Sequence, residues 1–480
     1  MKHDLCIFSE IGKYFVNKET NSAMYAIMDS TKALSLKEQQ LFPTQSKRNC
    51  KVTQLQVLQL LLMFPCFMVH NAYNFATSSL YKLIDCQKDI FYRFLSNETY
   101  DWRKILSTIS IRLWKKAHTC SEHPSERPVC LMIDDTDYPK TGLCAEKLGK
   151  VFSHVEHKMI AGYKGLFLGI TDGVSQMLLD FCILGEKGKN GTYSMKQSQL
   201  DKQFYKERNE DSPVQKRIQE YDESKIKLMI EMIKRMIKLK VRFDYILADS
   251  WFSCAEVIKF VTSRHIRCHY LGMIKMGKTK YQYKGKDYSA KQLVSRLGTP
   301  KSGRKYSKKL QCYYITADVI LAGRKVRLFF TKRTKNADWN GLITTNTSLS
   351  FLEAYQIYSM RWSLEVIFKD CKTNLGLGKY QVRNFASQIA CTAITAMQYN
   401  ILSTAKRFSD YETLGGLFRG ATQDSIELTI TERIWGLMQE IVAIIAQCFC
   451  VDDNMAMEAL INHSEQIQQI SNLSRYKQAS

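Results

Sequence analysis

The sequence of 480 residues predicts a mixed α/β protein with helical regions at both ends. Short apolar runs, which are typical of buried strands, occur at residues 129–133, 166–171, 176–184, 243–249 and 269–275. Apolar residues recur at helical spacing at about 215–239, and a further helix is expected at about 250–264 after the strand that ends in Asp249. Strands that alternate with helices in this order favour a mixed sheet covered by helices.

Five regions follow from the pattern along the chain. Residues 1–125 are predicted to be helical and basic, which favours a DNA-binding domain, although a helical scaffold with a solvated basic surface explains the same segment. The α/β core is expected over 126–275 and again over 341–400. Residues 276–340 are rich in Lys, Arg and Tyr and predict a β-rich insertion. Residues 401–480 are predicted to be helical, with dimerisation as their expected role.

Composition narrows the classes of protein to consider. The formal net charge is +23, so we expect a polyanionic partner, with nucleic acid favoured over a membrane surface. The fifteen cysteines are scattered without zinc-finger spacing, which predicts reduced thiols in a cytoplasmic protein. No apolar run reaches the ~20 residues of a membrane span, and the N-terminus lacks the apolar segment of a signal peptide. No glycine-rich phosphate loop occurs, so ATP is not an expected ligand.

A single helix predicted over residues 349–374 carries one acid among several cations. Ser350 and Glu353 have the spacing of a capping box, which marks where the helix begins. At 3.6 residues per turn, one face of this helix holds five polar side chains: Tyr358, Arg361, Glu365, Lys369 and Lys372. A solvated charged face stabilised by pairs four residues apart explains the same pattern. The helix alone therefore does not establish a site.

Two more acids end predicted strands and suggest a chemistry. Asp134, with Asp135 as the alternative, follows the strand at 129–133, and Asp249 ends the strand at 243–249. Mg²⁺ takes carboxylate and phosphate oxygens as ligands, and two such ions can activate the nucleophile and stabilise the leaving oxygen of a phosphodiester. We therefore expect Asp134, Asp249 and Glu365 to converge, although they are far apart in the sequence. Without metal, the cluster should raise the pKa of at least one of these carboxyl groups.

These residues resemble a known family. The spacing Tyr358-x2-Arg361-x3-Glu365-x6-Lys372, within YSMRWSLEVIFKDCK, is similar to the Tyr-Arg-Glu-Lys signature of bacterial DDE transposases of the insertion-sequence-four family. IDDT and LADSWF resemble the first-acid and second-acid motifs of that family, and a β-rich insertion before the glutamate is also one of its features. The resemblance covers about residues 128–384 and implies a ribonuclease-H-like core.

The resemblance also implies a function and roles for individual residues. The family cuts DNA at the terminal inverted repeats of insertion sequences and joins the 3′ ends to target DNA, using two Mg²⁺ ions, for which Mn²⁺ is expected to substitute. The expected assembly is a homodimer in a synaptic complex in the bacterial cytoplasm, associated with the nucleoid. Carried over by position, the metal ligands are Asp134, Asp249 and Glu365, and the DNA contacts are Tyr358, Arg361, Lys369, Lys372 and, as a residue that stacks on a flipped base, Trp339.

Two alternatives and one ambiguity remain open at this point. A ribonuclease-H-like nuclease or resolvase that cuts without strand transfer would use the same acids. A non-catalytic DNA-binding derivative of a transposase would keep the basic surface. The doublet Asp134-Asp135 leaves the first ligand ambiguous; Asp134 is preferred because relatives show Asp, any residue, then Thr or Ser, and Thr136 has that spacing. Asp135 would then point to the other side of the strand.

Overall fold

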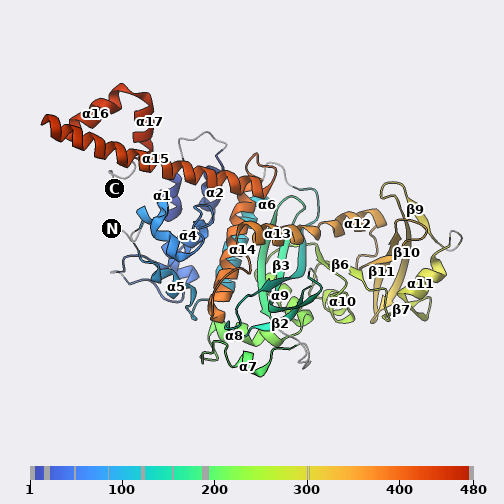
Figure 1. Cartoon of the computed structure of the whole chain (residues 1–480). Helices are drawn as coiled ribbons and strands as arrows, with labels where there is room; N and C mark the ends of the chain where they lie inside the picture. The colour runs from blue at the N-terminus through green and yellow to red at the C-terminus, as the bar shows by residue number, and fades with distance from the viewer. Residues whose placement is uncertain are drawn as a thin grey trace. The chain divides into compact units, whose positions relative to one another are not determined.

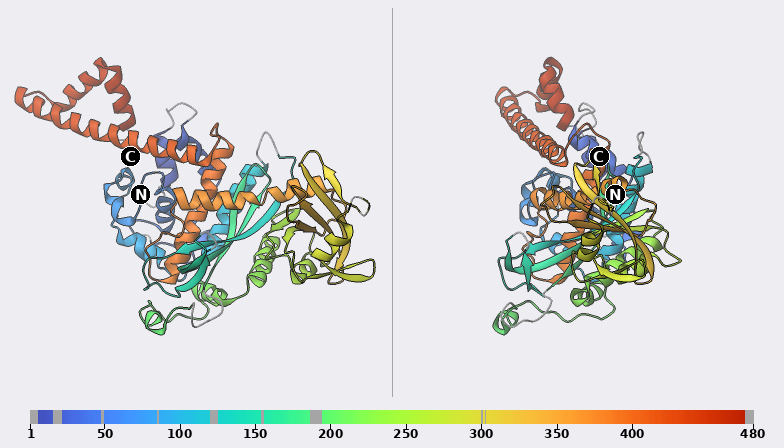
Figure 2. Two further views of the ribbon diagram at one scale, coloured as in Figure 1. Left: turned by 45° about the vertical axis from the view of Figure 1, so that its right-hand side comes forward. Right: turned by 90° about the vertical axis from the view of Figure 1, so that its right-hand side faces the viewer.

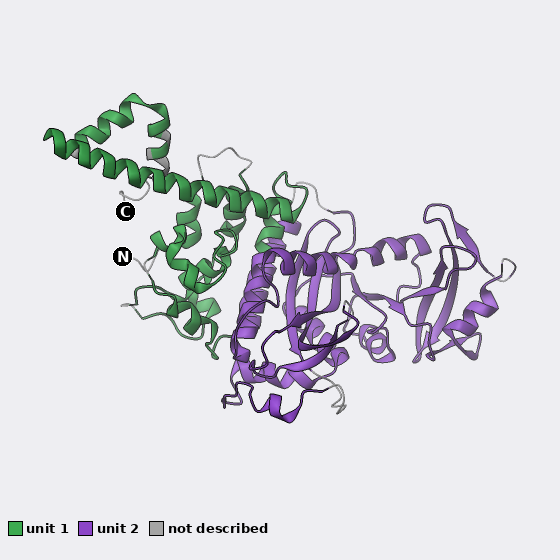
Figure 3. Ribbon diagram, in the orientation of Figure 1, with its two compact units in different colours: residues 1–100, 400–480 green, residues 101–399 purple. Residues whose placement is uncertain are grey.

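A computed structural model of the chain describes residues 6–15, 22–47, 50–84, 86–119, 125–153, 156–185, 194–299, 301 and 303–474. The chain divides into two compact units (Figure 3). Unit 1 contains residues 1–100 and 400–480, so the two ends of the chain belong to the same unit. Unit 2 contains residues 101–399 and holds every residue singled out above as a candidate ligand or DNA contact.

Unit 1 is helical in the part of the chain that the structure describes. Its elements are α1 (Ile7–Lys13), α2 (Ala23–Lys32), α3 (Glu38–Leu41), α4 (Gln54–Met63), the 3₁₀ helices η1 (Ala72–Thr77) and η2 (Ser79–Lys82), α5 (Asp89–Leu95), α15 (Leu414–Phe449), α16 (Asp453–His463) and α17 (Glu465–Ser474). Asp424 on α15 accepts hydrogen bonds from the Ser22 hydroxyl at 2.7 Å and the Met24 backbone at 2.9 Å, which ties α15 to α2. Both views in Figure 2 show α16 and α17 folded back beside the far end of α15.

Unit 2 is built on one mixed sheet. The core strands are β1 (Cys130–Pro139), β2 (Gly149–Ser153), β3 (Lys158–Thr171), β4 (Gln176–Leu184), β5 (Tyr245–Ala248) and β6 (His269–Ile274). β1 pairs antiparallel with β3, and β3 pairs antiparallel with β4. On its other side β1 pairs parallel with β5, and β5 pairs parallel with β6. The order β4-β3-β1-β5-β6 is that of a ribonuclease-H-like core, as the resemblance implies, and the mixed α/β fold is confirmed.

The sheet continues through the region between β6 and the late helices. β12 (Asn340–Thr344) pairs antiparallel with β6 and links the core to β11 (Arg324–Lys332), which pairs in turn with β10 (Cys312–Leu321). The other elements of this region are β7 (Lys280–Tyr283), β8 (Lys286–Ser289), α11 (Ala290–Leu297) and β9 (Lys305–Ser307). Residues 276–340 thus contain five strands and one helix in their described part, and these strands extend the core sheet (Figure 1).

Helices cover both faces of the core sheet. They are α6 (Trp102–Thr119), α7 (Gln197–Leu200), α8 (Pro213–Gln219), the 3₁₀ helix η3 (Glu220–Asp222), α9 (Lys225–Lys238), α10 (Ala255–Val261), α12 (Phe351–Ser359), α13 (Trp362–Asn374) and α14 (Phe385–Arg407), which runs on past the end of unit 2. Successive side chains of a strand point to opposite faces, and Asp134 contacts α13 whereas Asp135 contacts α9. α13 and α9 therefore lie on opposite faces of β1.

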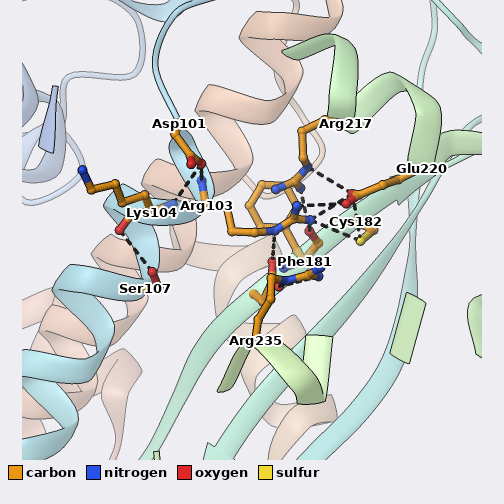
Figure 4. A network of polar contacts seen from close by, with 10 residues as sticks. Asp101, Arg103, Lys104, Ser107, Phe181, Cys182, Arg217, Glu220 and Arg235 are labelled. Atoms are coloured by element: carbon orange, nitrogen blue, oxygen red, sulfur yellow. Dashed lines mark hydrogen bonds and ion pairs between the residues drawn. The ribbon is translucent and has the colours of Figure 1, made fainter. Parts of the chain in front are cut away.

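A buried ionic network joins α6 to the sheet (Figure 4). Asp101 accepts hydrogen bonds from the backbone N–H groups of Arg103 and Lys104, and so caps the start of α6. The Arg103 guanidinium donates to Asp180 on β4 at 2.9 Å and to both oxygens of Glu220 at 2.9 Å. Asp180 is 1% exposed and also accepts a 2.8 Å bond from Arg235 on α9. This network holds α6, β4, η3 and α9 in one arrangement.

Two local predictions were wrong in detail. The single helix expected over 349–374 is two helices, because Met360, Arg361 and Leu364 bond to carbonyls three residues back and tighten the chain between α12 and α13. The helix after Asp249 is shorter than expected and begins after Cys254, and the Ser253 hydroxyl pairs with that of Tyr270 at 2.9 Å. The capping box at Ser350 and Glu353 is present.

Among the described residues, no helix is long and apolar enough to cross a membrane. Every cysteine that the structure describes is a free thiol.

Candidate active site

Asp134 and Asp249 lie on neighbouring parallel strands. The β1–β5 ladder ends at the pair Ile133 and Ala248, so the next residue of each strand is an aspartate at the same level. β1 does not end there as predicted, because its antiparallel ladder with β3 continues to Pro139. Asp134 is therefore held inside a strand at the point where β5 leaves the sheet. The charge of Asp249 is close enough to contribute to the raised pKa of Asp134.

Glu365 reaches the first aspartate through Arg361. One guanidinium nitrogen of Arg361 donates to Asp134 Oδ2 at 2.7 Å, and the other donates to Glu365 Oε1 at 2.6 Å. The side chain of Arg361 is 13% exposed, that of Asp134 19% and that of Glu365 36%. The planar guanidinium of Arg361 thus binds two carboxylates that are 231 residues apart in the sequence.

The electrostatics of this cluster follow from burial and from its neighbours. Burial raises the pKa of Asp134 to about 6; Arg361 opposes this shift, while Asp135 and Asp249 add to it. The two carboxylates and Tyr358 raise the pKa of Arg361 above its usual value despite burial, so the guanidinium stays charged. Burial is the main cause of the raised pKa of Asp134, and the repulsion expected among clustered acids adds to it.

Asp135 has a different set of partners on the opposite face. Its oxygens pair with Lys225 at 2.7 Å and Lys164 at 3.3 Å, and Lys164 also pairs with Asp137 at 2.6 Å. Burial would raise the pKa of Asp135, but the two lysines outweigh it and hold the pKa below its usual value. Two cations thus already neutralise Asp135, whereas Asp134 faces the other acids.

The residues that were predicted to contact DNA differ in their burial and in their distance from the acids. Tyr358 is half-buried, its ring centroid lies 5.8 Å from the Arg361 guanidinium carbon, and burial raises its pKa to about 12. Lys372 is half-buried near Asp137, and burial lowers its pKa. Lys369 is exposed on α13. Arg361 was predicted to contact DNA, but in this structure its guanidinium pairs with Asp134 and Glu365.

Buried polar atoms at this site lack protein partners. Among the described residues, the Tyr358 hydroxyl and Arg361 Nε are buried without a hydrogen-bond acceptor or donor. Unsatisfied buried polar atoms are rare and often mark a position that a ligand or ordered water completes. Arg361 pairs with Asp134 and Glu365, and the Tyr358 hydroxyl lies near Asp134 and Asp249, so a ligand with acceptor oxygens, such as a phosphate, would satisfy both atoms.

The three acids offer ligand atoms of the type that hard divalent ions bind. Asp134, Asp249 and Glu365 supply carboxylate oxygens, which Mg²⁺ and Mn²⁺ accept as ligands. Within the described part of the chain, no three such side chains are arranged closely enough to form a ready metal cluster. The Arg361 guanidinium lies between Asp134 and Glu365 and keeps these two carboxylates apart.

Trp339 and Trp251 lie at the same edge of the sheet as the acids. Trp339 immediately precedes β12, is partly exposed, and has Lys332 Nζ 4.9 Å from its ring centroid. Trp251 follows Asp249 by two residues and is 57% exposed. Sequence reasoning gave Trp251 no role, although its position in the run LADSWF, directly after an acid at a strand end, was a signal for one.

Comparison with known proteins agrees with this geometry in part. Residues 78–310 match a family model described as DDE superfamily endonuclease, a range that contains Asp134 and Asp249 and ends before Glu365. No functionally curated protein matches the sequence. Among solved structures, a cryo-EM structure of a piggyBac transposase synaptic complex with hairpin DNA is similar, with a TM-score of 0.41 and 10% identity, covering 88% of this chain and 81% of that chain. Residues 78–310 are thus similar to the domain of DDE superfamily endonucleases.

Proposed function

We propose that this protein is a DNA transposase that cuts at insertion-sequence ends and joins the 3′ ends to target DNA. The observation that carries the proposal is that Arg361 pairs with both Asp134 and Glu365, while Asp249 follows the strand that pairs with the strand of Asp134, at one edge of a ribonuclease-H-like sheet. The similarity of residues 78–310 to DDE superfamily endonucleases supports it. The Tyr-Arg-Glu-Lys spacing supports the narrower assignment to the insertion-sequence-four family.

The three acids would hold two divalent ions, Mg²⁺ or Mn²⁺. Such ions activate the attacking oxygen and stabilise the leaving oxygen of a phosphodiester. Arg361 pairs with Asp134 and Glu365 and neutralises these two carboxylates, which would otherwise repel each other. We propose that Arg361 leaves this pairing when the site is loaded and turns to a DNA phosphate, for which its planar guanidinium is well suited.

The other cations and the aromatic residues near the acids would hold the DNA. Tyr358 on α12 offers a buried hydroxyl without a hydrogen-bond partner, and Lys369 and Lys372 lie in the C-terminal half of α13. Trp339 would stack on a flipped base. Residues 276–340 carry seventeen lysines and arginines against three aspartates, which accounts for most of the net charge of +23. This region would therefore bind the phosphates on either side of the cleavage point.

A second copy of the chain is proposed to pair along α15. Apolar side chains recur on this helix at alternating steps of four and three residues and remain between 45% and 61% exposed: Ile430, Ile434, Leu437, Ile441 and Ile444. This is the spacing of a coiled-coil seam, in which a matching helix covers the apolar stripe. A dimer of this kind would hold two DNA ends together.

Paired charge substitutions on α15 test the dimer. Leu437→Glu with Ile441→Glu should convert a dimer to a monomer in sedimentation-velocity measurements, because the acidic side chains cannot be buried in an apolar seam. Glu440→Lys, an exposed position on the same helix, is the matched control and should leave the dimer intact. A wild-type protein that sediments as a monomer would exclude this interface.

A cutting and joining assay tests the function. The protein is incubated with Mg²⁺, a supercoiled target plasmid and DNA that carries the inverted repeats flanking its own reading frame. Joined products support transposition. Cut products without joining would instead indicate a nuclease or resolvase, and bound but uncut DNA would indicate a non-catalytic derivative.

A further inference from the structure

Trp251 has a fixed backbone and an exposed side chain. Its backbone N–H donates to Asp249 Oδ1 at 2.9 Å, so the main chain is tied to the acid that ends β5. The next residue, Phe252, is 1% exposed and anchors the segment in the core. The ring of Trp251, in contrast, is 57% exposed. An indole held rigidly at its base but open to solvent beside a site for DNA cleavage is placed to receive a flat ligand.

Two lysines from different elements face this ring. Lys275 Nζ, directly after β6, lies 4.4 Å from the ring centroid, and Lys225 Nζ, at the start of α9, lies 5.6 Å from it. Lys225 is itself positioned by its ion pair with Asp135. Cation–π contacts of this kind are weak, so a phosphate can bind the Lys275 ammonium in their place, and it can bind Lys225 while Lys225 keeps its ion pair with Asp135.

The strand register brings the second tryptophan to the same edge. Gly341 of β12 pairs with Ile274 of β6, so the residue before β12, Trp339, lies near Lys275. On the far side of Trp339 its ring meets Lys332, whose neighbour Thr331 pairs with Asn340. Lysines and tryptophans therefore follow one another from the start of α9 to the sheet edge next to Asp249. The ring contacts and the register of β12 define this set, which we call the aromatic–lysine row; it comprises Lys225, Trp251, Lys275, Trp339 and Lys332.

We infer that Trp251 is a stacking platform for an unpaired DNA base next to the cleavage point, with Lys225 and Lys275 binding the phosphates on either side of that base. Alternating aromatic rings and cations are the chemistry that single-stranded or extruded nucleotides recognise, because every base has a flat face and every linkage a negative charge. The inference rests on the proposed function and adds to it a contact at the second acid, apart from the one expected of Trp339.

Binding of two DNA duplexes in EDTA, where no cutting occurs, tests the inference. Both are duplexes of 30 base pairs with a terminal dye for anisotropy and one central 2-aminopurine. In one probe this base is opposite thymine and paired, and in the other it is opposite an abasic site and free to leave the helix. The wild-type protein should bind the second probe roughly tenfold more tightly, equivalent to about 1.4 kcal/mol, and should quench its 2-aminopurine fluorescence.

Trp251→Ala should remove most of this preference and the quenching, while affinity for the paired duplex changes by about twofold or less. Trp251→Phe should restore part of the preference because it keeps a ring. Tyr205→Ala, which removes an aromatic side chain that is 78% exposed elsewhere in unit 2, is the matched control and should change neither quantity. A Trp251→Ala protein that keeps the full preference overturns the inference. Failure of the wild-type protein to bind even the paired duplex would instead overturn the proposed function.

Discussion

Replacement of Arg361 by alanine should destabilise unit 2 in the absence of metal. The guanidinium makes charge-assisted hydrogen bonds of 2.7 Å to Asp134 and 2.6 Å to Glu365. A hydrogen bond of this type is worth about 1.5–3 kcal/mol when shielded, and the more exposed Glu365 contributes less, about 1 kcal/mol. The expected loss is therefore about 3 kcal/mol. For a unit of about 300 residues the unfolding entropy is about 0.6 kcal/mol/K, so Tm should fall by about 5 °C.

Divalent metal should reverse much of this loss. In Arg361→Ala the carboxylates are left without their cation, and an ion that binds the folded protein stabilises it by mass action. Addition of Mg²⁺ in place of EDTA should therefore raise the Tm of Arg361→Ala by several degrees more than that of the wild type. Differential scanning calorimetry measures both values.

Arg327→Ala provides the matched control for this experiment. Arg327 also pairs with a carboxylate through two bonds, to Asp318 at 2.7 and 2.9 Å, but in the region of β10 and β11. Mg²⁺ should change the Tm of the Arg327→Ala protein by the same amount as it changes the Tm of the wild type. An Arg361→Ala protein that is as stable as wild type in EDTA, or that gains no more from Mg²⁺ than Arg327→Ala, would refute the reasoning.

The remaining predictions concern cutting, DNA binding and acid stability. Glu365→Gln should abolish DNA cutting in gel assays but leave DNA affinity within a fewfold, and retained cutting would remove Glu365 from the site. Lys372→Ala should lower the slope of log K against log salt by about 0.9, the effect of one lost phosphate contact, with exposed Lys240→Ala as control; an unchanged slope would exclude that contact. Asp180→Asn should lower Tm at pH 7. Arg103 and Arg235 outweigh burial and lower the pKa of Asp180 in the folded protein to about 2. The difference in Tm between the variant and the wild type should therefore shrink by about half at pH 3. This stabilisation is present above the unfolded pKa of about 3.9 and is lost as pH falls toward 2; a difference that is constant with pH would contradict the assignment.

The core strands of the fold could be predicted from local sequence patterns. Apolar runs bounded by turns located β4, β5 and β6 to within a few residues, because buried strands exclude polar side chains wherever they occur. The acids at the end of the β1–β5 ladder could be predicted for the same reason, since the apolar run stops where the buried ladder stops. The full length of β1 could not, because residues 134–139 are held by pairing with β3, a partner that their own polar sequence does not reveal.

The site could be predicted only as a set of residues and not as an arrangement. Helical spacing placed Arg361 and Glu365 on one face, but whether the guanidinium turns toward DNA or toward the acids depends on Asp134, which is 227 residues away. The hydrogen bond between the Ser253 and Tyr270 hydroxyls, just before α10, is likewise a tertiary effect. Trp251 was missed because exposure of an aromatic ring beside a strand end cannot be read from an apolar pattern.

Mn²⁺ binding tests most directly whether the three acids form one metal site. Electron paramagnetic resonance counts free Mn²⁺ in titrations of the wild type and of Asp134→Asn, Asp249→Asn and Glu365→Gln, with Asp135→Asn as control. We predict that each of the first three substitutions weakens binding by at least tenfold, whereas Asp135→Asn, whose carboxylate pairs with Lys225 and Lys164, has little effect. Equal Mn²⁺ affinity in the wild type and all four variants would contradict the account.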